Sequence, residues 1–102
     1  MRVRVSRGAN VVDYGIEVSG LGCFCTVSRD GRKVAEYDAL RPDYDGLPGL
    51  LRLLVSTGVV DEEAVVAAVQ LLPRIEAVDE IDHSGTRFVA GVILRCRPAA
   101  TA

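Results

Sequence analysis

Residues 23–39 of this chain read CFCTVSRDGRKVAEYDA, and this stretch decides the fold. On both sides of Asp30-Gly31, apolar and polar residues alternate as they do in half-buried strands. Asp-Gly is a strong signal for a two-residue hairpin turn, because both residues tolerate the positive φ that such a turn needs. The stretch therefore predicts two antiparallel strands, over 23–28 and 33–39. With a two-residue loop, the expected cross-strand pairs are Arg29–Arg32, Val27–Val34 and Phe24–Tyr37.

Two further strands are expected before this hairpin. Residues 2–6 alternate between Arg and Val, which places Val3 and Val5 on one face. Residues 12–18 alternate in the same way. The apolar face of this second segment consists of Val12, Tyr14, Ile16 and Val18. The first four elements of the chain are thus predicted to be strands.

The hydrophobic period then changes from that of a strand to that of a helix. Apolar residues recur at i, i+3, i+4 and i+7, which indicates a helix, at Leu47, Leu50, Leu51 and Leu54. We expect Asp45 to cap this helix and Gly58 to follow its last turn. A second helix is predicted to begin at Asp61 and to end at Pro73.

Residues 86–96, TRFVAGVILRC, are predicted to form an interior strand that is covered on both sides. One face would carry Phe88, Ala90, Val92, Leu94 and Cys96, and the other Val89 and Ile93. Residues 75–81 are expected to be extended as well. The element order is then ββββααββ, which predicts an α+β fold: a mostly antiparallel sheet of five to six strands with a two-helix hairpin packed on one face. Residues 1–97 would form one domain and 98–102 a flexible C-terminal tail.

The second predicted helix is nearly devoid of polar residues. It reads DEEAVVAAVQLL over 61–72, and after Glu63 its only polar residue is Gln70. A helix that is apolar all round is normally buried on all sides, and a chain of 102 residues offers both helices only one sheet face. Small Val and Ala side chains could pack tightly within one chain, or the helix could contact another chain. We favour an interface, with Val65, Val66, Val69, Leu72, Leu51 and Leu54 as its residues.

The charge balance and the cysteine count narrow the class of function. Twelve Lys and Arg against fourteen Asp and Glu give a net charge of −2, so nucleic acid is not expected as a partner. No apolar run approaches the roughly 18 residues of a membrane span, and no signal-peptide pattern is present. An odd number of cysteines, three, argues against an oxidised disulfide framework. We therefore expect a small cytoplasmic, non-enzymatic protein-interaction module without a cofactor, acting as a homodimer or as a partner-binding subunit.

An alternative is a small enzyme or ligand-binding domain with an acidic site around residues 79–87. Asp79, Glu80, Asp82 and His83 stand together beside a turn, with Arg87 close by. A histidine next to carboxylates can act as a general base or bind a divalent cation. No nucleophile stands at a recognisable spacing, so a non-enzymatic role is favoured and the question of enzymatic activity stays open.

The cysteines form a weak candidate metal site. Cys23, Cys25 and Cys96 could hold zinc together with His83, the only histidine. The C-x-C spacing departs from the usual C-x₂₋₄-C of structural zinc sites. We therefore favour buried thiols that pack as small apolar groups, and no bound metal.

The predicted first and last strands each carry two arginines on one face. These residues are Arg2, Arg4, Arg95 and Arg97. If the two strands were neighbours, four guanidinium groups would converge and would need an anion, carboxylates or a partner beside them. The acidic segments 36–45 and 76–82 could supply the carboxylates.

Overall fold

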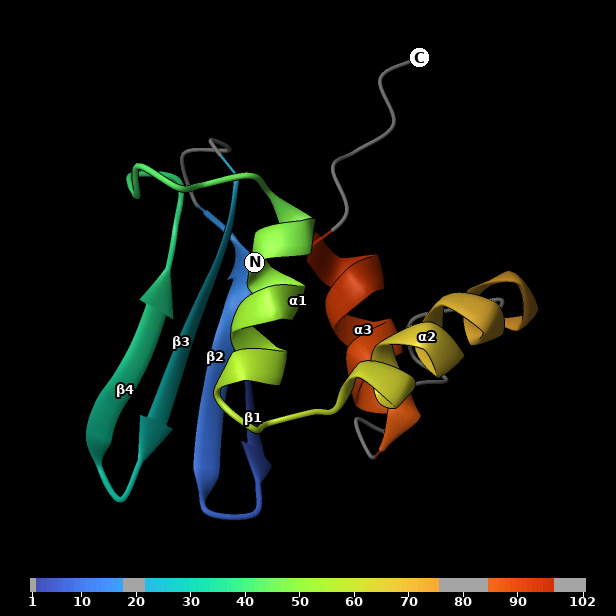
Figure 1. Cartoon of the computed structure of the whole chain (residues 1–102), viewed down its shortest axis with the longest axis horizontal. Helices are drawn as coiled ribbons and strands as arrows, with labels where there is room; N and C mark the ends of the chain where they lie inside the picture. Colours follow the sequence, from blue (N-terminus) through green and yellow to red (C-terminus); the bar gives the residue numbers. More distant parts are fainter. Residues whose placement is uncertain (1, 18–21, 76–84, 97–102) are drawn as a thin grey trace.

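The computed structural model describes residues 2–17, 22–75 and 85–96 and shows an α+β fold (Figure 1). The strands are β1 (Arg2–Arg7), β2 (Asn10–Ile16), β3 (Cys23–Arg29) and β4 (Arg32–Tyr37). The helices are α1 (Leu47–Ser56), α2 (Glu62–Leu71), the short 3₁₀ helix η1 (Leu72–Arg74) and α3 (Thr86–Cys96). The predicted fold class is confirmed, but the described residues form four strands rather than five or six.

The sheet is an antiparallel meander in the order β1-β2-β3-β4. Its β3–β4 turn is the predicted one: Asp30 and Gly31 have φ of +54° and +78°, and Arg29 pairs with Arg32. Two successive positive φ values characterise the type I′ turn, whose twist matches that of the flanking strands.

The predicted pairs farther along this hairpin are wrong by one residue. A β-bulge beside Val27 leaves Val34 without a direct partner, so Val27 pairs with Ala35 and Cys25 pairs with Tyr37. The predicted partners were Val34 for Val27 and Phe24 for Tyr37. The shift places Tyr37 on the same face as Cys25, where both are buried. Burial of one sheet face thus determined a register that the turn alone did not.

Helices α1 and α3 cover one face of the sheet (Figure 1). α1 contacts β3 and β4, whereas α3 contacts β2. α2 packs mainly against α3, farther from the sheet (Figure 1). The predicted packing of an α1–α2 hairpin on the sheet is therefore wrong for α2, because α3 takes that place. No helix in the described part of the chain is long and apolar enough to cross a membrane.

The segment predicted as the last strand is helix α3. Its buried residues lie on nearly every side of the helix: Phe88, Val89, Ala90, Gly91, Val92, Ile93 and Cys96. A short run that is apolar throughout fits a buried strand or a buried helix equally well, so alternation carried no information here. Residues 76–81 of the segment predicted as extended, and the tail at 98–102, lie outside the described residues.

The predicted helix ends are confirmed with one exception. Asp61 caps α2 by accepting a hydrogen bond from the Ala64 N–H at 2.8 Å. Gly58, with φ of +77°, follows α1, and Pro73 lies just beyond α2. The N-cap of α1 is Gly46 rather than Asp45, since the helical backbone begins one residue later than expected, at Leu47. The Asp45 side chain has other partners, described below.

Candidate interaction surface

Helix α2 leaves an apolar face in water. Ala68 is its only buried residue, and it lies within the core cluster that α3 also joins. Val66 and Val69 expose 58% and 55% of their surface, and the predicted interface residues Val65 and Leu72 are only partly buried. α3 separates α2 from most of the sheet, so the core of this chain does not cover these valines.

Helix α1 has two different faces. Leu50 and Leu54 point into the core and are fully buried. Leu54 therefore belongs to the interior of the single chain, and we leave it out of the surface. The outward stripe, at positions i, i+3, i+4 and i+7, consists of Pro48, Leu51, Arg52 and Val55.

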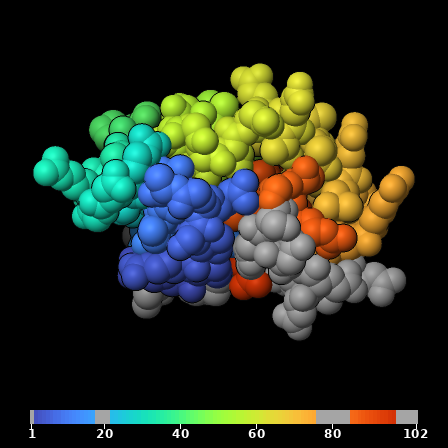
Figure 2. Space-filling view, turned by 90° about the horizontal axis from the view of Figure 1, so that it is seen from below, coloured from blue at the N-terminus to red at the C-terminus, as the bar shows by residue number. Residues whose placement is uncertain are grey.

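The outward stripes of α1 and α2 enclose a groove of about 710 Å³. The surfaces of the two helices meet along one edge of the molecule, yellow-green for α1 and yellow to gold for α2 (Figure 2). We call this feature the α1–α2 groove; it is lined by Pro48, Leu51, Arg52, Val55, Ser56, Glu62, Val65 and Val66. Val69 is not among the lining residues, but its helical spacing of three and four residues from Val66 and Val65 places it on the same face of α2. Five lining residues were not predicted from the sequence, although their helical spacing from Leu51 and Val66 could have indicated them: Pro48, Arg52, Val55, Ser56 and Glu62.

Opposite charges stand toward the two ends of this groove. The Arg52 guanidinium donates a hydrogen bond to Asp45, just before α1 begins. Glu62 stands in the first turn of α2, beyond the last residue of α1. The groove therefore carries the Arg52–Asp45 ion pair toward the start of α1 and the Glu62 carboxylate toward its end.

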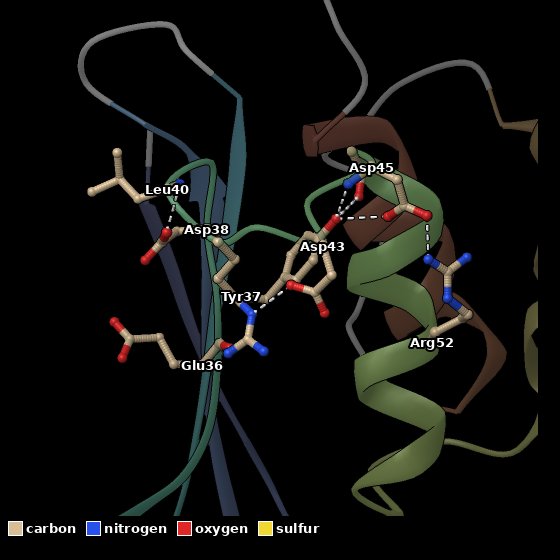
Figure 3. A network of polar contacts seen from close by, with 9 residues as sticks. Glu36, Tyr37, Asp38, Leu40, Asp43, Asp45 and Arg52 are labelled. Atoms are coloured by element: carbon tan, nitrogen blue, oxygen red, sulfur yellow. Dashed lines mark hydrogen bonds and ion pairs between the residues drawn. The ribbon is translucent and has the colours of Figure 1, made fainter.

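Arg52 is held in place by a polar clasp that consists of Tyr37, Asp45 and Arg52 (Figure 3). The Tyr37 hydroxyl donates to Oδ1 of Asp45 at 2.7 Å and accepts from the Asp45 backbone N–H at 2.7 Å. Oδ2 of Asp45 accepts from Arg52. The hydrogen bonds from Arg52 and then from Tyr37 lower the pKa of Asp45 below its ordinary value. The clasp joins the end of β4 to the outward side of α1.

Gly49 shows how closely α1 approaches this clasp. A Cβ atom at this position would lie 2.1 Å from Oδ1 of Asp45 and 2.2 Å from the Tyr37 hydroxyl oxygen. Any side chain would push the first turn of α1 away from β4. The glycine therefore keeps Asp45 within reach of both Tyr37 and Arg52.

The three cysteines are buried free thiols in the core. Burial raises the pKa of Cys25 and of Cys96 to about 12, so both stay protonated at neutral pH. Among the described residues, no group of three or more His, Cys, Asp and Glu side chains is placed to hold a metal ion. His83 lies outside those residues.

The condition for a convergence of four arginines, two neighbouring strands, is not met, because residues 86–96 form a helix. Arg2 and Arg4 lie on the outer face of β1, with their Nε atoms 3.5 and 2.9 Å from Oδ1 of Asp13 on β2. Arg95 belongs to α3, which covers the opposite face of the sheet, and Arg97 lies outside the described residues. Since residues 86–96 form a helix, no strand brings the two pairs together. Asp13, the cross-strand partner of Arg4, supplies the countercharge that was expected from the acidic segments.

The alternative acidic site cannot be placed in this fold. Asp79, Glu80, Asp82 and His83 all lie outside the described residues. Arg87 is exposed in the first turn of α3. The site around residues 79–87 therefore stays a sequence-based prediction.

Comparison with known proteins gives no match to this chain, whether among protein-family models, curated proteins or solved structures.

Proposed function

We propose that this chain is a non-enzymatic interaction module that associates with a second copy of itself through the α1–α2 groove. One observation carries the proposal: Val66 and Val69 are more than half exposed beside a second apolar stripe on α1. Contiguous apolar surface of this kind is a common mark of protein interfaces.

Nothing in the described part of the chain favours valine at these two positions. Valine is only a moderate helix former, because its branched side chain is restricted in a helix. Val66 and Val69 also contribute little to the core, since both are exposed. Covering each of them would contribute on the order of 1–2 kcal/mol at about 25 cal/mol per Å². Association of two copies would cover four such side chains, Val66 and Val69 of each copy, together with the α1 stripes.

Sedimentation velocity over about a hundredfold range of concentration tests the proposal, since self-association follows mass action. We expect a species of twice the 10.9 kDa chain mass that dissociates on dilution. Val66→Glu and Val69→Glu should each weaken the dimer by about a hundredfold, because they would bury an unpaired carboxylate.

Leu40→Glu is the matched control. Leu40 is 86% exposed in the loop after β4 and lies outside the α1–α2 groove, so this variant should dimerise like the unchanged chain. A chain that stays monomeric at every concentration would overturn the proposal. So would an equal loss of association in Leu40→Glu and Val66→Glu.

A further inference from the structure

The charges of the α1–α2 groove indicate how two copies meet. We infer that the dimer has a two-fold axis across the groove, which places Arg52 of each copy on Glu62 of the other. This inference rests on the proposed function and adds the orientation and the polar contacts of the interface. Both residues line the groove: the Arg52 guanidinium reaches back to Asp45, just before α1 begins, and Glu62 lies in the first turn of α2, after α1 has ended.

A two-fold axis across the groove brings oppositely charged residues of the two copies together. In a two-fold interface, a contact between residue i and residue j of the partner is repeated between j and i. When the groove of the second copy runs in the opposite direction to that of the first, Arg52 of each copy faces Glu62 of the other, which gives two Arg52–Glu62 pairs. A parallel arrangement would instead place Arg52 on Arg52 and Glu62 on Glu62, and like charges that face each other in an interface repel each other and disfavour it.

Arg52 is free to make this contact while it stays in the clasp. Its side chain is 65% exposed, and only one of its terminal nitrogens binds Asp45. A guanidinium group has five N–H donors in a fixed plane, so donors remain for a second carboxylate. Asp45 also restricts the side chain beforehand, which lowers the entropy lost on pairing.

Glu62 is equally available. It is exposed, and within the described part of the chain no ion pair engages it. The apolar residues Leu51, Val55, Val65 and Val66 line the same groove. The surface thus combines an apolar centre with a charged rim, as protein interfaces commonly do.

Charge exchange between two full-length variants tests the orientation. R52E alone, or E62R alone, places like charges at both ends of the dimer and should raise its dissociation constant at least about tenfold. In an equimolar mixture, each R52E chain can form two opposite-charge pairs with an E62R chain. Native mass spectrometry, which separates the species by mass, should then show the heterodimer in excess over both homodimers. The double variant R52E/E62R should regain homodimers.

Arg52→Gln controls for damage to the clasp, because it loses the Asp45 contact without reversing the charge. Circular dichroism verifies that each variant is folded. If R52E does not fold, Arg52→Gln and Glu62→Gln replace the exchange: their effects on the dissociation constant should be non-additive, since either one removes the same pair.

The outcomes separate this inference from the proposed function. Unchanged association of R52E alone or E62R alone would overturn the orientation, because in a parallel dimer each variant only exchanges one like-charge pair for another. A mixture without excess heterodimer, or additive effects of the two glutamine variants, would overturn it as well. If Val66→Glu still abolished the dimer in that case, association through the groove would stand. A monomeric unchanged chain would remove both.

Discussion

Helices α2 and α3 are nearly equal in length, at 10 and 11 residues, and both are largely apolar, yet they differ in how much of their surface the core buries. Most of α3 is buried, whereas α2 buries only Ala68. The difference lies in position, because α3 packs on β2 and α2 packs mainly on α3. Apolar composition indicates that a helix should be buried against other residues. Which helix the chain itself can bury depends on which one packs directly on the sheet.

The largest test of this contrast is a truncation in α3. Phe88 is fully buried, with its ring edge-to-face on Tyr14 at 6.0 Å between centroids. Phe88→Ala should lower the free energy of unfolding by about 3–5 kcal/mol, through lost burial and the cavity left behind. Urea denaturation at a concentration where the chain is monomeric measures this loss. Val66→Ala, on the exposed face of α2, should change stability by less than about 0.5 kcal/mol. Similar losses in both variants would contradict the contrast.

A smaller effect is expected where α2 itself meets the core. Ala68 is fully buried in the core cluster, so a larger side chain must displace its neighbours. Ala68→Leu should cost about 1–3 kcal/mol by overpacking, measured in the same urea titration. Gln70→Leu adds a leucine at an exposed position of the same helix and should leave the stability almost unchanged. Equal effects would show that the buried face of α2 is wrongly assigned.

The smallest effect concerns α1, which is fixed to β4 by the polar clasp as well as by packing. The pKa of Asp45 is lowered in the folded chain by Arg52 and then by Tyr37. Its stabilisation is therefore complete above the ordinary aspartate pKa of about 3.9 and is lost as the pH falls through the lower folded value. Asp45→Asn should be less stable than the unchanged chain at neutral pH, and this difference should vanish in strong acid.

Thermal unfolding followed by circular dichroism across that pH range measures the difference. Asp30→Asn is the control, because the β3–β4 turn lies outside the clasp and asparagine also suits the turn. A difference that persists unchanged into strong acid would show that the charge of Asp45 does not hold α1.

The local parts of the fold could be predicted from the sequence because their signals are local. Asp30-Gly31 specified a turn, and Asp61 and Gly58 marked helix ends through contacts with near neighbours. The register beyond the turn could not be predicted, because it depends on a bulge at Val34. This bulge places Tyr37 on the buried face of the sheet. Only the tertiary structure contains that information.

The assignment of residues 86–96 failed for a related reason. With apolar residues on every side, neither the strand period nor the helix period stands out, and the wrong choice also placed Arg95 beside Arg2 and Arg4. The prediction that α2 lacks cover rested on composition, and Val66 and Val69 are indeed exposed. On α1, the prediction included Leu51, which lines the groove, and Leu54, which is buried in the core. Pro48 and Val55 were missed because the spacing of Leu47, Leu50, Leu51 and Leu54 was interpreted as a single apolar face.

The contact of α3 with β2 joins segments about seventy residues apart in the chain and has a consequence during synthesis. The four strands and α1 can assemble from near neighbours as they leave the ribosome, but Tyr14 lacks its aromatic neighbour until Phe88 has emerged. Contacts of such long sequence separation form slowly, because the loop between them must close first. A nascent chain that ends at α2 therefore exposes the apolar face of β2. This face becomes buried only after α3 has been synthesised and has packed on it.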